Sequence, residues 1–150
     1  MQQQKTATLA TIFSEILADL AFMFSEEDDT DLLSGEEWLE TSINYEGTVS
    51  GTLRFWCTQA FSVVLASNLL GIDPDDENAS SQARDAAKEL MNIICGQFVT
   101  AVHGTDDVFE LSIPHIEGLS ETPDCAEAQD SEVAAFIVDG EQVRLSHTPH

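Results

Sequence analysis

The pattern of apolar and polar positions predicts three helices, and the longest of them organises the chain. This helix covers Ser80–Gly104, where each residue turns the chain by about 100° around the helix axis. One stripe of the helix is apolar, and the opposite arc consists of polar residues and one glycine. The apolar stripe holds Ala83, Ala87, Leu90, Ile94, Phe98 and Ala101, and the opposite arc holds Asp85, Glu89, Asn92 and Gly96. We interpret the rest of the chain as the platform that supports the polar arc.

Apolar residues at helical spacing also predict a helix at 6–24 and another that begins after Thr58 and runs up to Gly71. In the first helix, Glu15 and Asp19 lie on the outer side. Its predicted core-facing side chains are Ile12, Phe13, Ile16, Leu17, Leu20 and Phe24. In the second, Thr58 is suited to the N-cap and Gly71 stands where a C-cap glycine belongs.

Alternating apolar and polar residues predict about five strands. The first two cover 37–45 and 52–57, and a hairpin between Glu46 and Gly51 connects them. On one side of the first strand lie Leu39, Thr41, Ile43 and Tyr45. Gly51 alternatively marks a bulge or a close approach of another group.

The remaining strands are predicted in the last third of the chain. They cover 108–113, 133–138 and 143–145. Pro114 ends the first, because proline has no backbone N–H to donate to a sheet. Asp139-Gly140 is a hairpin turn between the other two, and the acidic residues 117–132 are predicted to form a loop.

Grouped helices and hairpin-connected strands together predict an α+β fold. We expect an antiparallel β-sheet of about five strands with three α-helices packed against it. One domain is expected to cover residues 1–150, with an N-terminal helix at 6–24, an acidic linker at 25–36 and a core of strands and helices at 37–147.

The charge of the chain limits its partners. Twenty-eight acidic residues against five basic ones give a net charge of −23. Nucleic acids and anionic membranes need cations to neutralise their phosphates, so the chain is expected to bind neither. The acidity has two interpretations: solubility or a salty environment, and steering towards a partner with a basic surface.

Three cysteines without a CxxC pair indicate neither a disulfide framework nor a zinc site. No apolar run has the length of a membrane span, and Glu15 and Asp19 interrupt the N-terminal apolar stretch, which argues against a signal peptide. The expected location is therefore the cytoplasm.

Most familiar kinds of site are not indicated. Residues 25–36 contain clustered aspartates but lack the glycine and glutamate of an EF-hand calcium loop. The four histidines are scattered, and no glycine-rich phosphate loop precedes a helix. Asp85 and Glu89 lie one turn apart, but no pattern of aromatic platforms supports a carbohydrate cleft.

The polar arc of the long helix is the remaining candidate. One interpretation is an ordinary solvated helix face. Two residues argue against it, because Asn92 is a poor choice for a helix interior and glycine, as at Gly96, costs about 1 kcal/mol relative to alanine. Glycine at position 96 is more natural where another backbone approaches the helix.

These residues resemble a known family. Asp85-x3-Glu89-x2-Asn92, followed across a strand by Pro114, resembles the motif of the CheC/CheX/FliY-type chemotaxis phosphatases. GTVSGTLRFWCTQAFSVVLASNLLG is similar to that family's strand-to-helix segment, and LSIPHIEG to its strand-to-proline segment. The resemblance runs from about Glu37 to the C-terminus. One motif in a short domain with an extra N-terminal helix fits the CheX-like members best.

The resemblance implies a protein aspartyl-phosphate phosphatase that acts on a CheY-like response-regulator receiver. Asn92 would hold the attacking water, and Glu89 would pair with the lysine of the receiver's active site. Asp85 would contact the partner at the rim, and Pro114 would close the motif. Gly96 would let the partner approach, which is our own inference. The protein would need no cofactor or metal of its own, since the receiver carries Mg²⁺. The resemblance also implies a homodimer, which would form through an exposed strand edge.

Two alternatives from other classes stay open. The same fold could be a non-catalytic binding module that docks on a receiver or a signalling scaffold. It could also be an acidic structural or assembly protein whose polar helix face has no special role. The sequence does not identify the receiver, so the chemotaxis pathway is taken only from the family name.

Overall fold

The structure, a computed structural model, describes residues 9–125 and 132–150. These residues form three α-helices, one π-helical turn and seven strands, joined by turns and loops. In chain order they are α1 (Leu9–Ile16), η2 (Leu17–Ala21), β1 (Ser25–Glu27), β2 (Trp38–Glu46), β3 (Ser50–Thr58), α2 (Gln59–Leu70), α3 (Ala79–His103), β4 (Glu110–Leu111), β5 (His115–Leu119), β6 (Glu132–Val138) and β7 (Glu141–Pro149).

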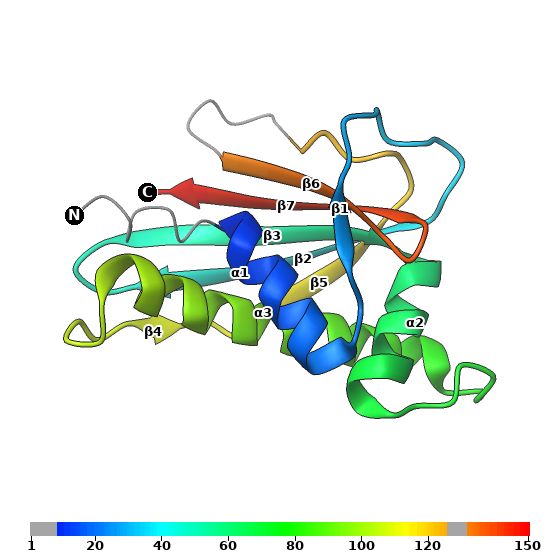
Figure 1. The fold of residues 1–150 in the computed structure, drawn as a ribbon, viewed down its shortest axis with the longest axis horizontal. Coiled ribbons are helices and arrows are strands. Elements are labelled where there is room, and N and C mark those ends of the chain that lie inside the picture. Colours follow the sequence, from blue (N-terminus) through cyan, green and yellow to red (C-terminus); the bar gives the residue numbers. More distant parts are fainter. Residues whose placement is uncertain (1–8, 126–131) are drawn as a thin grey trace.

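The strands form one antiparallel sheet in the order β1-β6-β7-β3-β2 (Figure 1). The outer edge of β2 is shared by two short strands, β4 and β5, which pair with different parts of it. The predicted α+β fold is therefore confirmed, although the described residues form seven strands rather than about five.

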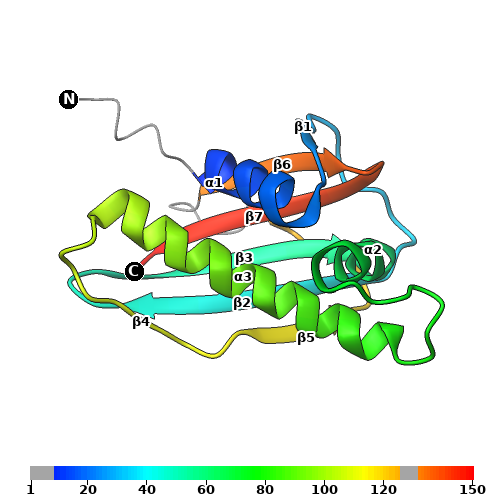
Figure 2. The ribbon, with the colours of Figure 1, turned by 60° about the horizontal axis from the view of Figure 1, so that its bottom comes forward.

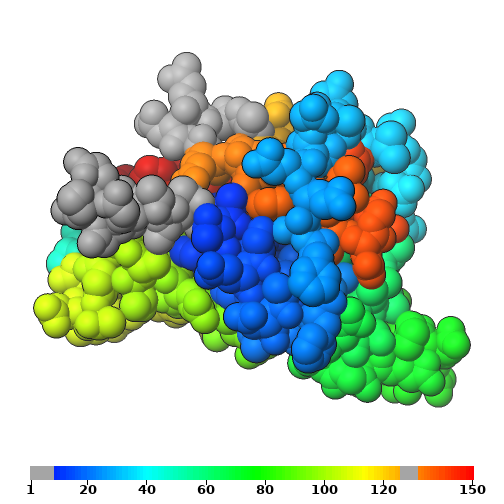
Figure 3. All heavy atoms as spheres, in the orientation of Figure 1, coloured from blue at the N-terminus to red at the C-terminus, as the bar shows by residue number. Residues whose placement is uncertain are grey.

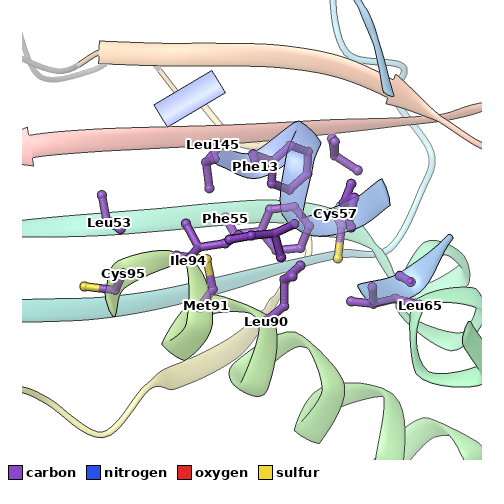
Figure 4. Close-up of a cluster of buried hydrophobic side chains, with 14 of the residues drawn as sticks. Phe13, Leu53, Phe55, Cys57, Leu65, Leu90, Met91, Ile94, Cys95 and Leu145 are labelled. Atoms are coloured by element: carbon purple, nitrogen blue, oxygen red, sulfur yellow. The ribbon is translucent and has the colours of Figure 1, made fainter. Parts of the chain in front are cut away.

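All three helices cover the same face of this sheet (Figure 2). The core lies between the two layers, where side chains of α3 meet those of β3 and of α1 (Figure 4). The side chains at its centre are Phe13, Leu53, Phe55, Cys57, Leu65, Leu90, Met91, Ile94, Cys95 and Leu145. Since α3 packs across β2 and β3, its opposite face is left to solvent.

The first helix is shorter than predicted. The α-helix ends at Ile16, a π-helical turn follows, and Phe22 adopts a left-handed conformation with φ 55°. This change of geometry leaves Leu20 and Phe24 exposed, so their predicted place in the core is wrong. Residues 6–8 of the predicted helix lie outside the described residues.

The predicted acidic linker contains a strand and a buried charge. Residues of β1 pair with β6, and the blue atoms of α1 and β1 lie beside the orange atoms of β6 on the face seen in Figure 3. Just after β1, the Asp28 carboxylate accepts hydrogen bonds from Arg144 Nη1 at 2.9 Å, Gln142 Nε2 at 3.0 Å and the Thr30 N–H at 3.0 Å. Burial alone would raise the pKa of Asp28, but a hydrogen bond from the Thr30 hydroxyl and the three bonds above outweigh it and lower the pKa to about 2.

The β2–β3 hairpin confirms two predictions. The turn lies between Glu46 and Ser50, inside the predicted interval. Gly51 faces the ring of Tyr45 so closely that a Cβ atom there would lie 2.5 Å from the tyrosine oxygen. A side chain at Gly51 would displace that ring, whose hydroxyl lies 2.7 Å from His147 Nε2. Gly51 therefore marks a close approach.

The ends of the helices agree in part with the sequence. Thr58 caps α2, because its Oγ1 accepts a hydrogen bond from the Phe61 N–H at 3.0 Å, and Gly71 ends the helix with φ 72°. The long helix α3 starts at Ala79, one residue before its predicted start, and Asn78 at its N-cap position makes no side-chain capping bond.

The predicted strand at 108–113 is mostly irregular, since only Glu110–Leu111 is extended and paired. The predicted loop at 117–132 begins inside β5, and residues 126–131 lie outside the described part of the chain. The Asp139-Gly140 turn is confirmed, with both residues at positive φ between β6 and β7. No helix in the described residues is long and apolar enough to cross a membrane.

Candidate functional site

Burial along α3 largely follows the prediction from its pattern of apolar and polar residues. Ala83, Ala87, Leu90, Ile94 and Phe98 are buried. Asp85, Glu89 and Asn92 are exposed, and Gly96 is partly buried. Ala101 is also exposed, so its predicted place on the buried stripe is wrong, because burial along α3 stops at Val99.

An open groove of about 480 Å³ runs beside the polar arc of α3. Its helix side and its opposite wall are lined by Asp85, Lys88, Glu89 and Asn92 from α3, and by Leu111, Ser112, Ile113 and Pro114 from the segment that joins β4 to β5. The structure therefore brings four of the five predicted site residues together, and they lie on one surface.

The opposite wall owes its shape to a break in the sheet edge. The Ser112 N–H donates to the Asn44 carbonyl at 2.9 Å, and the Asn44 N–H donates to Ser112 Oγ at 3.0 Å. Pairing with β2 resumes only at His115, because Pro114 has no N–H to offer. Between these points the Ile113 side chain projects from the edge with 89% of its surface exposed.

The fifth predicted residue, Gly96, lies along α3 beyond this groove. It lines a neighbouring hollow of about 300 Å³, which shares Leu111 with the first groove. Apart from the neighbouring residues and backbone of its own helix, a Cβ atom at Gly96 would meet no atom within 4 Å. Nothing in the described part of this chain therefore requires glycine at position 96.

The two central side chains of the groove are available for external contacts. Within the residues that the structure describes, Glu89 and Asn92 make no side-chain hydrogen bond or ion pair. They lie three residues apart on a helix, so they project in similar directions. Carboxylate oxygens only accept hydrogen bonds, whereas a carboxamide both donates and accepts them. This pair can therefore hold a cationic group and a water molecule side by side.

The groove contains few groups for covalent chemistry. Its one hydroxyl, that of Ser112, is engaged with the Asn44 N–H, and no histidine or cysteine is among the residues that line it. Burial raises the pKa of the Cys57 thiol, and it raises that of Cys95 to about 12, so both thiols are protonated in the core. No cluster of three or more metal-ligating side chains occurs in the described residues.

Lys88 is a groove residue that the sequence analysis missed. Its Nζ lies 3.9 Å from Asp85 Oδ1, one turn back on the same helix. A signal was present in the composition: the chain has only five Lys and Arg residues, and Arg84 and Lys88 stand one turn apart on α3. Such clustering of scarce cations is informative in a chain of net charge −23.

An antiparallel sheet with helices on one face, and with a polar helix arc beside a broken sheet edge, defines an α+β protein with an open surface site. A family model for the chemotaxis phosphatase CheX matches residues 40–136, and the chain belongs to that family. The resemblance inferred from the motif is thereby confirmed.

Solved structures agree with this assignment at the level of the fold. Chemotaxis protein CheX from Vibrio vulnificus superposes with a TM-score of 0.75 at 12% identity, covering 97% of this chain and 95% of that one. A CheX from Desulfovibrio desulfuricans gives 0.68 at 14% identity, with 95% and 96% covered. A chain of the CheX-CheY-BeF3-Mg²⁺ complex from Borrelia burgdorferi gives 0.65 at 19% identity, with 95% of each chain covered. Curated protein sequences include no significant match.

Proposed function

We propose that this protein hydrolyses the aspartyl phosphate of a CheY-like response-regulator receiver domain. Membership of the chemotaxis phosphatase CheX family supports a phosphatase. A CheX was solved in complex with CheY, BeF3 and Mg²⁺, which supports a receiver as the partner. The observation that carries the proposal for this chain is the free, adjacent pair of Glu89 and Asn92 in an open groove.

The proposed roles follow from the chemistry of the two side chains. An aspartyl phosphate is a reactive mixed anhydride, so the main requirement is a water molecule in line with the phosphorus. Asn92 holds that water, since a neutral carboxamide can orient it beside the phosphoryl oxygens without repelling them. The water oxygen bonds to phosphorus, the bond to the aspartate oxygen breaks, and the products are inorganic phosphate and a free carboxylate.

Glu89 anchors the helix on the partner. Its carboxylate pairs with the lysine that the receiver contributes next to the phosphoryl group, and the i, i+3 spacing lets Glu89 and Asn92 enter one cleft together. Asp85 contacts the rim of that cleft, and Pro114 limits the groove on the other side. The Mg²⁺ that accompanies the phosphoryl group belongs to the receiver in this proposal.

The test is the lifetime of phosphorylated receivers from the same organism, with and without this protein. Each receiver is phosphorylated with a small-molecule phosphodonor, and phosphate release is followed after the donor is removed. Asn92→Ala should reduce the acceleration by about 10²-fold or more, because a misplaced reactant costs that much. Glu89→Gln should mainly weaken binding.

Gln97→Ala is the matched control, because Gln97 is an exposed carboxamide on α3 that does not line the groove. It should behave as the unaltered protein does. If Asn92→Ala keeps the full rate, the catalytic assignment is wrong.

A non-catalytic docking role is the second candidate, and the exposed Ile113 side chain beside the groove favours it as a contact surface. This role predicts a complex with a receiver whose phosphoryl lifetime does not change. If neither Glu89→Gln nor Asn92→Ala alters a complex or a lifetime, the polar arc is an ordinary solvated face.

Homodimerisation through a strand edge stays a prediction. The two outer edges of the sheet are the short strands β1 on one side and β4 and β5 on the other. Light scattering of the purified protein across a concentration series would decide between one and two copies.

A further inference from the structure

A receiver surface that carries a phosphoryl group is anionic, and this chain has a net charge of −23. The two molecules should therefore repel each other unless cations lie where they meet. Four of the five Lys and Arg residues fall in the described part of the chain, namely Arg54, Arg84, Lys88 and Arg144. Their positions decide where an anionic partner can approach.

Two of these cations serve other elements of the fold. Arg144 is buried and its guanidinium binds Asp28. Arg54 lies on the sheet face without helices, where its Nε is 3.9 Å from Glu40 Oε2. The other two, Arg84 and Lys88, both stand on α3 within or next to the groove.

Only Lys88 of this α3 pair lines the groove itself. Arg84 reaches across β5, since its Nη2 lies 3.4 Å from the position that a Cβ on Gly118 would take. Lys88 stands directly before Glu89 in sequence and one helical turn before Asn92, and its side chain is 38% exposed. The ammonium group therefore sits at the rim of the proposed reaction site.

The ion pair that Lys88 makes within the chain is weak. The distance to Asp85 is 3.9 Å, and the Asp85 side chain is 68% exposed, so water screens the attraction. Exchanging Asp85 for an anionic oxygen of a partner thus costs little. A lysine has a flexible stem and three donors, which suits it to follow such an oxygen as the surfaces dock.

We propose that Lys88 is a partner-binding residue that pairs with an anionic oxygen of the phosphorylated receiver at the rim of the groove. This inference rests on the proposed function, because the receiver is its partner. The oxygen can belong to the phosphoryl group or to a carboxylate of the receiver. A rim cation raises the association rate and the affinity but does not orient the attacking water, so its removal should raise KM and leave kcat unchanged.

The chain offers a closely matched control. Arg54 is 39% exposed against 38% for Lys88, and both cations stand 3.9 Å from one carboxylate oxygen. Lys88→Gln and Arg54→Gln therefore remove the same charge and break ion pairs of the same length, one at the groove and one on the opposite face of the sheet. The partners differ in one respect, since the Glu40 side chain is 26% exposed and accepts a hydrogen bond from Trp56 Nε1, whereas the Asp85 side chain is 68% exposed. Any difference between them reports the position of the charge rather than the net charge.

The experiment measures phosphate release and direct binding for both variants at low and high salt. At low ionic strength Lys88→Gln should raise KM by about 3- to 10-fold with kcat within about twofold, and Arg54→Gln should change neither by more than about twofold. At roughly 0.5 M NaCl, where screening is strong, the effect of Lys88→Gln should shrink to about twofold. Lys88→Arg should restore most of the lost affinity.

Binding to the phosphorylated and to the unphosphorylated receiver separates the two sources of the oxygen. A loss of affinity confined to the phosphorylated form assigns the contact to the phosphoryl group, and an equal loss in both assigns it to a carboxylate. Equal KM values for Lys88→Gln and Arg54→Gln, or a loss confined to kcat, would overturn the proposal.

The outcomes also separate this inference from the proposed function. If Asn92→Ala keeps the full rate, the catalytic assignment fails, while the affinities of the Lys88 and Arg54 variants still decide the role of Lys88. If the unaltered protein neither binds any phosphorylated receiver nor accelerates its dephosphorylation, both proposals fail.

Discussion

The Asp28–Arg144 and Asp85–Lys88 pairs use the same kinds of charge in opposite settings. In the first, the two atoms lie 2.9 Å apart and the side chains are 0% and 8% exposed. In the second, they lie 3.9 Å apart and the side chains are 68% and 38% exposed. The buried Asp28–Arg144 pair therefore stabilises the fold, whereas Lys88 in the exposed pair can exchange Asp85 for another anionic partner.

The hydrogen bonds around the two pairs sharpen this contrast. Both oxygens of Asp28 accept hydrogen bonds, and Arg144 also donates to the Thr30 carbonyl at 2.8 Å, which fastens the loop after β1 to β7. Beside Lys88, by comparison, Glu89 and Asn92 have no partner among the described residues. Satisfied polar groups indicate a structural role, and unsatisfied exposed ones leave binding capacity for another molecule.

The largest expected effect comes from breaking the buried pair. Arg144→Met should lower the free energy of unfolding by about 3–5 kcal/mol, because it leaves the Asp28 carboxylate buried without its countercharge. Lys88→Gln breaks the exposed pair and should cost no more than about 0.5 kcal/mol. Urea denaturation of both variants measures the two losses, and similar values would remove the contrast between the pairs.

Acid should weaken the buried pair next. The pKa of Asp28 is about 2 in the folded protein against 3.8 in the unfolded chain, so the unfolded state binds the proton first as the pH falls. The resulting stabilisation of about 2 kcal/mol is fully present above about pH 4 and is lost as the pH falls through about 2.

Denaturation curves of the unaltered protein and of Asp28→Asn across this pH range provide the measurement. The gap in stability between them should narrow by about 2 kcal/mol between pH 5 and pH 2. A gap that stays constant would show that the carboxylate titrates alike in both states.

The smallest expected effect concerns the open side of the comparison. Gly96→Ala places a methyl group in free space, so the free protein should gain about 0.5–1 kcal/mol of stability from the better helix former. If a partner backbone approaches α3 there, the same methyl group should weaken receiver binding. Unchanged affinity in a titration would refute a close approach at Gly96.

Local periodicity was enough to predict the helix that carries the candidate site. The buried positions of α3 from Ala83 to Phe98 and the exposed Asp85, Glu89 and Asn92 follow directly from the helical repeat. The close approach at Gly51 could also be predicted locally. A glycine within a strand leaves space where a side chain would lie, and the Tyr45 ring occupies that space. In each of these cases the residues involved are close in sequence.

Features that depend on distant residues escaped prediction. The strand β1 has an ordinary acidic sequence and is extended because β6, more than a hundred residues later, pairs with it. The alternation predicted a strand at 108–113 that Pro114 ends, but only Glu110–Leu111 forms a strand there. After Pro114 the chain pairs with β2 again as β5, which was not predicted because its partner is more than seventy residues earlier in the chain. Lys88 can be recognised as a groove residue only in the structure, where the segment that joins β4 to β5 lies opposite it across the groove.

The antiparallel pairing of β1 with β6 bears on the order in which the chain can fold as it is synthesised. Early-made residues contact late-made ones: Phe13 stacks on Phe136 at a ring distance of 5.1 Å, and Asp28 binds Arg144. Until the β6–β7 hairpin has been made, the apolar side of α1 lacks that part of its packing surface and the charge of Asp28 has no arginine partner. The nascent chain must therefore carry an uncovered apolar segment through most of its synthesis, and a truncation before the hairpin would leave that segment as a target for chaperones and proteases.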